Sequence, residues 1–206
     1  MNIEIKISKK PVEYTKAITF LEKRLVKIKN HKASELVWML EHPKVYTGGI
    51  SYKNFEILDN NIKIIKTNRG GKITWHGPGQ IVCYFVLDLN KRNKDIRKFI
   101  INIEKIIIKT LEEYKIKSFS DRKNIGIWVN HKNKIKKIGA IGIKVKNWIA
   151  YHGFSININN ELKSYKKIIA CGINNREVTN LKKIKNQEYN FFKEKIIKNF
   201  IKYLKV

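Results

Sequence analysis

The chain has 206 residues, with 44 Lys and Arg against 17 Asp and Glu, which gives a formal net charge of +27. This length suffices for one domain with a substantial core, and no apolar run approaches the roughly 18 residues that a membrane span needs. The first residues lack an apolar signal segment and the two cysteines do not indicate a disulfide framework, so we expect a cytoplasmic protein. The charge is mostly lysine spread among isoleucine and asparagine, as codon bias alone would produce, so it does not by itself indicate a nucleic-acid partner.

The N-terminal quarter predicts two strands, one helix and a loop. Residues 2–8 alternate apolar and polar side chains, as a strand does. Pro11 suits a first helical turn, so a helix is expected to begin near it. Residues 35–41 are a short apolar run bounded by polar residues, typical of a buried strand, and a loop is expected over residues 42–49. The buried stripe of the helix is predicted at Ile18, Leu21, Leu25 and Ile28.

The middle of the chain predicts a central strand followed by a second helix. Residues 62–67 read as a strand, and residues 81–89 are almost entirely apolar and β-rich. Cys83 lies in that second run, where we expect a buried core thiol. Asp95 is a suitable N-cap for the helix. Its buried stripe is predicted at Ile96, Phe99, Ile100, Ile103, Ile107 and Leu111.

The last part of the chain predicts more strands and a final helix. Strands are expected over residues 125–130, 136–146 and 148–158, with a hairpin turn over residues 131–134. Because strands cluster in runs and helices fall between the runs, we expect one α+β domain over residues 1–206, a mixed or antiparallel sheet with packed helices. The last 20 residues predict a helix with an apolar residue every four positions, at Phe192, Ile196, Phe200 and Leu204.

The most distinctive stretch is residues 68–80, Asn-Arg-Gly-Gly-Lys-Ile-Thr-Trp-His-Gly-Pro-Gly-Gln, which holds four of the 11 glycines. Glycine allows positive φ angles and close approach of a ligand to the backbone, and Pro78 excludes a helix interior. The stretch is therefore a loop, or a loop between strands. Its guanidinium (Arg69), hydroxyl (Thr74) and imidazole (His76) indicate a binding loop, with a tight solvated hairpin as the alternative.

Three further segments carry groups suited to chemistry. Residues 137–142 read Lys-Ile-Gly-Ala-Ile-Gly, residues 151–157 read Tyr-His-Gly-Phe-Ser-Ile-Asn, and residues 169–173 read Ile-Ala-Cys-Gly-Ile. A cysteine is a good nucleophile as a thiolate, and a cation such as Lys137 would favour that form if the fold brings the two together. Each part alone is ordinary: a surface lysine, a turn glycine or a buried cysteine. No group of Cys and His has the spacing of a metal site.

Together, these motifs resemble the lipoyl(octanoyl) transferase family, the acyltransferases of protein lipoylation. The resemblance covers most of the chain and leaves out the C-terminal helix, from about residue 184. The order of the motifs along the chain makes a chance match a poor explanation. They are Glu-His-Pro-Lys-Val-Tyr-Thr-Gly at residues 41–48, Arg-Gly-Gly at 69–71, Thr-Trp-His-Gly-Pro-Gly-Gln at 74–80, Gly-Ile-Trp-Val at 126–129, the three segments above, and Glu-Val-Thr-Asn-Leu at 177–181.

The resemblance implies a biotin/lipoate ligase-like α+β domain with no cofactor and no metal. Cys171 would be the nucleophile that becomes an acyl-thioester, and Lys137 would tune its pKa and shuttle protons. Two residues depart from the family pattern: Ala170 stands where Pro is usual, and Ser155 stands where Ala is usual. Ser155 would make the pocket slightly more polar, and this leaves the preferred acyl length open. The acyl pocket would be lined by Arg69, Gly70, Gly71, Lys72, Ile73, Thr74, Trp75, His76, Ala140, Ile141, Gly142, Gly153, Phe154 and Ser155.

By the same resemblance, the donor would be octanoyl-acyl carrier protein. The acceptor would be a lysine on a lipoyl domain of 2-oxoacid dehydrogenase E2 subunits or on the glycine cleavage H protein, in the first step of endogenous protein lipoylation. We expect a monomer with no nucleic-acid or membrane partner.

Two alternative functions stay open at the level of sequence. An ATP-dependent lipoate–protein ligase would share the fold and the motif lysine, but it would need ATP and Mg²⁺ and no cysteine. A basic nucleic-acid-binding module would fit the net charge, and it would lose tight DNA binding steeply as salt rises. A catalytically decayed homologue is disfavoured because Lys137 and Cys171 are both present.

Overall fold

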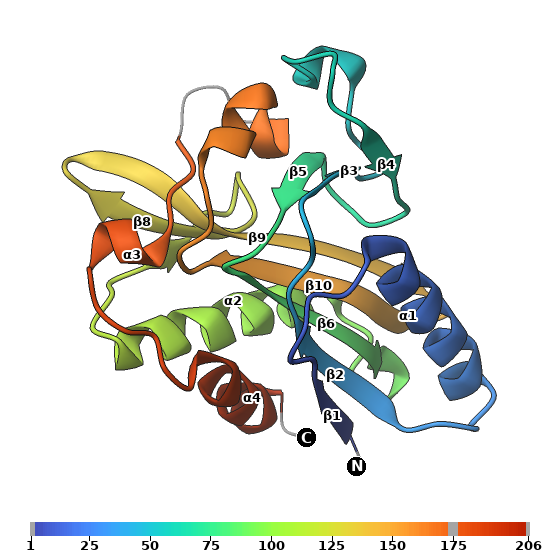
Figure 1. Cartoon of the computed structure of the whole chain (residues 1–206). Helices are drawn as coiled ribbons and strands as arrows, with labels where there is room; N and C mark the ends of the chain where they lie inside the picture. Colours follow the sequence, from blue (N-terminus) through green and yellow to red (C-terminus); the bar gives the residue numbers. More distant parts are fainter. Residues whose placement is uncertain (1–2, 173–176, 205–206) are drawn as a thin grey trace.

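The computed structural model describes residues 3–172 and 177–204, with only the backbone at Cys171. Within these ranges the chain forms a mixed seven-stranded sheet, a smaller three-stranded sheet and packed helices, which confirms the predicted α+β class (Figure 1). The large sheet has the order β1 (Ile3–Ile7), β2 (Glu35–Leu40), β6 (Gln80–Asp88), β10 (Ile149–Asn157), β9 (Lys134–Lys146), β8 (Ile127–His131) and β7 (Phe119–Ser120). The small sheet has the order β4 (Ile64–Lys66), β3 (Val45–Gly48) and β5 (Ile73–His76).

Helices cover both faces of the large sheet. Helix α1 (Tyr14–Lys29) packs on one face, and α2 (Ile96–Glu113) and α4 (Phe192–Tyr203) pack together on the other (Figure 1). The short α3 (Leu181–Ile184) precedes α4. Strand β6 is buried along its whole length because successive side chains enter the two cores in turn. Its residues on the α2 and α4 side are Ile81, Cys83, Phe85 and Leu87, and those on the α1 side are Val82, Tyr84 and Val86.

Helix α1 begins at Tyr14, later than predicted from Pro11. The backbone N–H of Val12 donates to the carbonyl of Glu41, and the carbonyl of Val12 accepts from the ring of His42. These bonds hold the residues before Tyr14 in an extended form, so the helix starts only after them. Helix α2 begins where predicted, because the Asp95 carboxylate accepts a hydrogen bond of 2.9 Å from the N–H of Lys98.

Two short strands were missed within predicted loops. Strand β3 lies inside residues 42–49 and β5 lies inside the glycine-rich stretch, and the two pair antiparallel. Each has only four residues, so neither shows a clear alternation by itself. The C-terminal helix was predicted over the last 20 residues, but it ends at Tyr203 and begins at Phe192. Its predicted apolar face is buried against α2.

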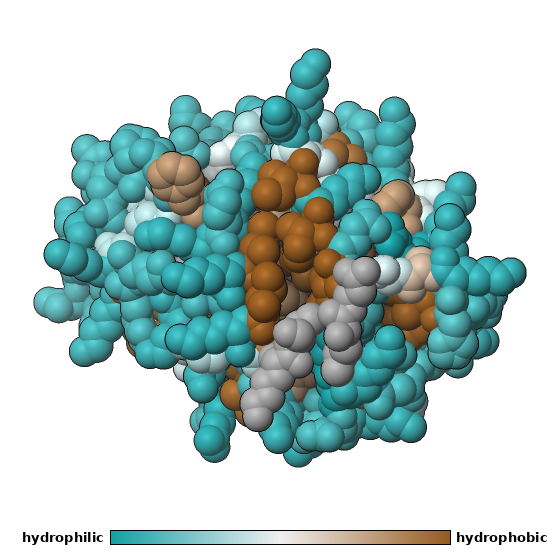
Figure 2. Space-filling model, turned by 90° about the horizontal axis from the view of Figure 1, so that it is seen from below, coloured by the Kyte–Doolittle hydropathy of each residue, from teal (hydrophilic) through white to brown (hydrophobic). Residues whose placement is uncertain are grey.

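The face seen from below in Figure 2 is largely hydrophilic, apart from an apolar strip near its centre. Strand β1 and helix α4, which both lie at the lower end of Figure 1, carry exposed apolar side chains, including Ile5, Ile7 and Ile201. Within the described ranges, each helix is too short or too polar to cross a membrane.

Candidate active site

A cavity of about 840 Å³ lies between the glycine-rich stretch and strands β9 and β10. Apolar side chains from β6, β9, β10 and the start of α2 form much of its wall. The fold therefore brings together the segments that sequence analysis singled out. The predicted site residues that line the cavity are Arg69, Gly70, Gly71, Lys72, Thr74, His76, Lys137, Ala140, Ile141, Gly142, Gly153, Phe154 and Ser155.

Two residues predicted to line the acyl pocket lie on the other side of β5. Ile73 and Trp75 are fully buried in the core of the small sheet, packed with Ile168. Thr74 and His76 face the cavity instead. The difference follows from the strand geometry, since successive side chains in a β-strand point to opposite faces. The prediction treated the stretch as a loop and so assigned all four residues to one side.

Lys137 is almost completely buried in β9, with 6% of its surface exposed. Its ammonium donates a hydrogen bond of 3.0 Å to the carbonyl of Ile125. It also lies 5.0 Å from the centre of the Trp128 ring, within the range of a cation–π contact. Lys137 is therefore not a surface lysine, and its charge is held at the wall of the cavity.

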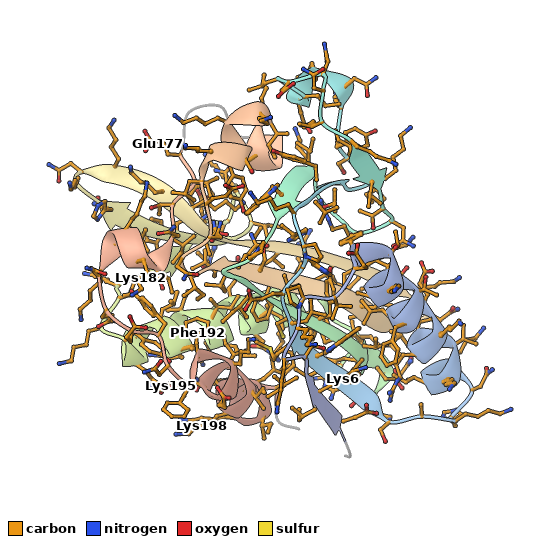
Figure 3. The ribbon with its side chains drawn as sticks, viewed as in Figure 1. Lys6, Glu177, Lys182, Phe192, Lys195 and Lys198 are labelled. Atoms are coloured by element: carbon orange, nitrogen blue, oxygen red, sulfur yellow. The ribbon has the colours of Figure 1, made fainter. Side chains whose placement is uncertain are left out.

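The backbone of Lys137 is bonded to the segment that follows the predicted nucleophile. Its N–H donates to the carbonyl of Glu177, and its carbonyl accepts from the N–H of Thr179, both at 2.8 Å. Figure 3 shows Glu177 beside the hairpin of β8 and β9, where its carboxylate pairs with Lys136. Residues 177–179 are therefore fixed to β9, the strand that carries Lys137.

Cys171 lies in the 3-10 turn Ala170–Gly172, and Gly172 lines the same cavity as Lys137. The side chain of Cys171 and all of Ile173, which belongs to the predicted motif, lie outside the described residues. Cys83, by contrast, is fully buried in β6, and burial raises the pKa of its thiol well above the usual range. This confirms the expectation of an inert core thiol at Cys83.

Arg69 holds the glycine-rich stretch in place. Its guanidinium donates to the carbonyl and to the hydroxyl of Thr47, both at 2.9 Å, which joins the stretch to β3. The N–H of Gly70 donates to the carbonyl of Ile143 in β9. A Cβ atom at Gly70 would lie 2.7 Å from that carbonyl oxygen, so the close approach of the two backbones requires glycine.

Neutral histidines lie at the cavity wall or in contact with it: His76 lines the cavity, and the ring of His42 contacts those of His76 and Tyr84. His42 accepts from the Tyr84 hydroxyl at 2.8 Å, and Tyr84 lines the cavity. His76 donates from Nδ1 to Gln80 at 2.6 Å. Burial lowers the pKa of His42 to about 4, although its hydrogen bond to Val12 opposes the shift. Burial, with a smaller contribution from His42, lowers the pKa of His76 to about 3.

The same holds for His152, which lines the cavity from β10. Its Nε2 contacts the side-chain oxygen of Asn68 at 2.7 Å. Burial, and secondly the charge of Arg69, lower its pKa to about 3. All three imidazoles are therefore uncharged at neutral pH, and Arg69, Lys72 and Lys137 supply positive charge at the cavity wall.

Several residues of the site were not predicted. Tyr84, Ile125 and Ile143 lie in segments read only as strands, and Asn124 lies in a stretch with no assigned role. Glu56, in the 3-10 helix Asn54–Glu56, is completely buried and pairs with Lys72. His42 was within a quoted motif, so its motif position was the available signal. Glu56 had no such signal, because a lone glutamate in a sequence is most often exposed.

This geometry can accommodate an apolar ligand that carries a polar group. Apolar walls bind an extended acyl chain, and the polar groups stand at the lysine and at the turn that carries Cys171.

Comparison with known proteins agrees with the family resemblance of the sequence motifs. A protein-family profile described as the lipoyl protein ligase A/B catalytic domain matches residues 13–202. An octanoyltransferase of Anaplasma marginale (strain Florida) is 42% identical over 181 residues, which cover 87% of this chain and 85% of that protein. An octanoyltransferase of Anaplasma phagocytophilum (strain HZ) is 42% identical over 205 residues, 98% of this chain and 99% of that protein.

Solved structures confirm the predicted fold class. A bipartite lipoate protein ligase from Thermoplasma acidophilum has a TM-score of 0.76 at 14% identity, over 100% of this chain and 84% of that chain. A biotin protein ligase from Aquifex aeolicus has a TM-score of 0.54 at 15% identity, over 99% of this chain and 69% of that chain. At these identities the likeness concerns the fold alone. The sequence matches carry the assignment, and by them the chain belongs to the octanoyltransferase family, which is built on the lipoyl protein ligase A/B catalytic domain.

Proposed function

We propose that the protein transfers an octanoyl group from octanoyl-acyl carrier protein to a lysine of a lipoyl domain, through a thioester on Cys171. In the first step, the Cys171 thiolate attacks the donor thioester, the C–S bond to the carrier breaks, and the carrier thiol leaves with a proton from Lys137. In the second step, the neutral amine of the acceptor lysine attacks the Cys171 thioester. The new C–N bond forms as the C–S bond breaks, and Lys137 takes the surplus proton.

One observation carries this proposal: Lys137 and the turn that contains Cys171 border the same apolar cavity. The ammonium can favour the thiolate in the resting enzyme and lend its proton to the leaving thiol. Ala140, Ile141 and Phe154 supply apolar wall for the acyl chain. The names of the relatives support the choice of an octanoyl group.

The acceptor we propose is a lipoyl domain of a 2-oxoacid dehydrogenase E2 subunit or the glycine cleavage H protein. The acceptor lysine must reach the cavity from solution, so the protein that carries it has to dock around the opening. A net charge of +27 would speed the encounter with acidic partners, such as carrier proteins, and make the rate fall as salt rises.

The test is a donor reaction without ATP or metal. EDTA-treated protein is incubated with octanoyl-acyl carrier protein, and the adduct is detected by intact mass and located by peptide mapping. We expect octanoyl on Cys171 and its passage to an added apo lipoyl domain. Cys171→Ser should lose nearly all turnover, because a serine hydroxyl is a weaker nucleophile without a strong base beside it. Cys83→Ala is the control and should still be acylated at Cys171.

Two results would overturn the proposal. Octanoyl found only on Cys83, or on neither cysteine while transfer proceeds, would exclude the Cys171 intermediate. If the protein is inert until free octanoate, ATP and Mg²⁺ are supplied, the ATP-dependent ligase is the correct function.

A further inference from the structure

Lys72, in the glycine-rich stretch, forms an ion pair with Glu56 at the wall of the cavity. The distance from Nζ of Lys72 to Oε1 of Glu56 is 2.8 Å. The side chain of Glu56 is fully buried, whereas that of Lys72 is 35% exposed. A buried carboxylate that loses its cation is strongly destabilised, so the position of Glu56 depends on Lys72.

The segment that carries Glu56 also holds the chain that leads to Cys171. The carbonyl of Glu56 accepts from the N–H of Ile169 at 2.8 Å. Ile57 and Ile168 form an antiparallel bridge, and the N–H of Leu58 donates to the carbonyl of Lys167 at 2.9 Å. Residues 56–58 thus fix residues 167–169, immediately before the turn Ala170–Gly172.

Lys72 also touches the other end of that turn. A Cβ atom at Gly172 would lie 2.3 Å from Cδ and 2.4 Å from Nζ of Lys72, so the lysine side chain packs directly on the backbone of Gly172. Gly172 has a φ of +68°, a conformation that favours glycine. Its N–H donates to the carbonyl of Ile169 at 3.0 Å, which closes the turn.

We infer that the pair of Lys72 and Glu56 is a positioning device for the turn that carries Cys171. Glu56 anchors the start of the turn through Ile169, and Lys72 covers its end at Gly172, while the ion pair joins the two anchors. Lys72 therefore acts through the turn, in addition to the lining role that the family resemblance implies for it. The inference rests on the proposed function for the role of Cys171, but the geometry of the turn does not.

The experiment uses Lys72→Met, Glu56→Gln and the double variant. Met keeps the unbranched stem of Lys72 and removes its charge. The double variant leaves no buried charge without a partner, so it is the variant to use if Lys72→Met fails to fold. Hydrogen exchange of the amides of Ile169 and Gly172, and alkylation of Cys171 by iodoacetamide, need no substrate. Octanoyl transfer is measured alongside, with kcat separated from KM.

We expect exchange of the two amides to accelerate at least about tenfold in every variant, because the turn opens locally once its anchors are uncoupled. kcat should fall by a similar factor while KM for the donor changes little, since the walls of the cavity remain. The effects of the two substitutions should not add, because both break the same pair. In the double variant the melting temperature should stay near that of the wild type, which separates loss of positioning from loss of stability.

Lys109→Met is the matched control. It removes a partner from the exposed pair of Lys109 and Glu112 on α2, at 2.6 Å, and should change neither exchange nor kcat. Wild-type exchange at Ile169 and Gly172 in the variants, or strictly additive effects, would overturn the inference. If no octanoyl is transferred but the exchange of the two amides accelerates as described, the proposed function fails and the positioning device stands.

Discussion

The side chain of Lys137 occupies the space that a Cβ atom would need at Gly126. Such an atom would lie 2.6 Å from Cε and 3.0 Å from Nζ of the lysine. Gly126 has a φ of +140°, and it directly follows Ile125, whose carbonyl accepts the lysine hydrogen bond. The start of β8 is therefore shaped around the ammonium, and the glycine has a reason that is both steric and conformational.

We predict that Gly126→Ala will lower kcat by at least about tenfold, because the new methyl group displaces the ammonium from its position. The melting temperature will also fall, since alanine is strained at this φ. The decisive measurement is the same substitution in the Lys137→Met background. If Gly126 acts through the ammonium, it will have little further effect on kcat there, whereas equal effects in both backgrounds would contradict this reason.

A second prediction concerns the glycine-rich stretch. Gly71 has a φ of +84°, and its carbonyl accepts from the N–H of Ser51. Gly71→Val places a β-branched side chain in a conformation that costs about 1–3 kcal/mol, beside the Arg69 guanidinium, whose Nη1 lies 3.6 Å from the Cβ position. Activity should fall far more than stability.

The matched control is Gly71→Asn, since asparagine tolerates positive φ better than other residues with a side chain. It should keep more activity than the valine variant when both are assayed at a temperature where both are folded. A valine variant that is folded and fully active would show that the stretch is only a turn.

The elements that could be predicted are those whose signal is local. Helix α2 combines a capping Asp95 with a long apolar stripe, and both are read from neighbouring residues. The β9 and β10 hairpin was visible because both strands are long. Strands β3 and β5 have four residues each and become strands only by pairing with one another, which no local pattern reveals.

Because no local pattern reveals β5 as a strand, the positions of two of its side chains in the site were also predicted incorrectly. Thr74 and His76 line the cavity, whereas the alternation of β5 sends Ile73 and Trp75 to the opposite core. The family resemblance implied that Gly153 lines the acyl pocket. The structure gives another reason for a glycine at this position, since a Cβ atom there would lie 1.9 Å from the carbonyl oxygen of Cys83 in β6.

A third prediction follows from the neutral histidines. The pKa values of His42, His76 and His152 lie at about 4, about 3 and about 3, below the ordinary 6.5, because all three are buried. Between these pKa values and about pH 6.5, the histidines bind more protons in the unfolded chain than in the folded one. The stability that each contributes is complete above about pH 6.5 and is lost as pH falls toward the folded values, by at most about 1.4 kcal/mol per pH unit for each histidine.

His76→Asn tests this contribution. The asparagine amide can still donate to Gln80, as Nδ1 of His76 does, but it does not titrate. The free energy of unfolding is measured in urea from about pH 7 to about pH 4. Its slope against pH should be shallower in the variant, and the difference should correspond to at most about one fewer proton bound on unfolding. Identical slopes for the two proteins would show that His76 does not carry the effect.

The last prediction is that Lys137 and Cys171 act as a pair. Lys137 is buried at the cavity wall. Its backbone N–H and carbonyl form hydrogen bonds with Glu177 and Thr179, in the segment that follows the cysteine turn. An ammonium close to a sulfur favours the thiolate. Lys137→Met keeps the length of the side chain and removes the charge. Alkylation of Cys171 by iodoacetamide should then be slower at neutral pH and recover only at higher pH.

Lys137→Arg separates the two roles of the lysine. A guanidinium keeps the positive charge and should restore part of the alkylation rate, but it does not give up its proton and should leave octanoyl transfer slow. Lys109→Met, on the exposed face of α2, controls for a general change in surface charge. The measurement is the alkylation rate of Cys171 against pH for all four proteins. Superimposable curves for the wild type and Lys137→Met would falsify the pairing, because the thiolate would then form without the ammonium.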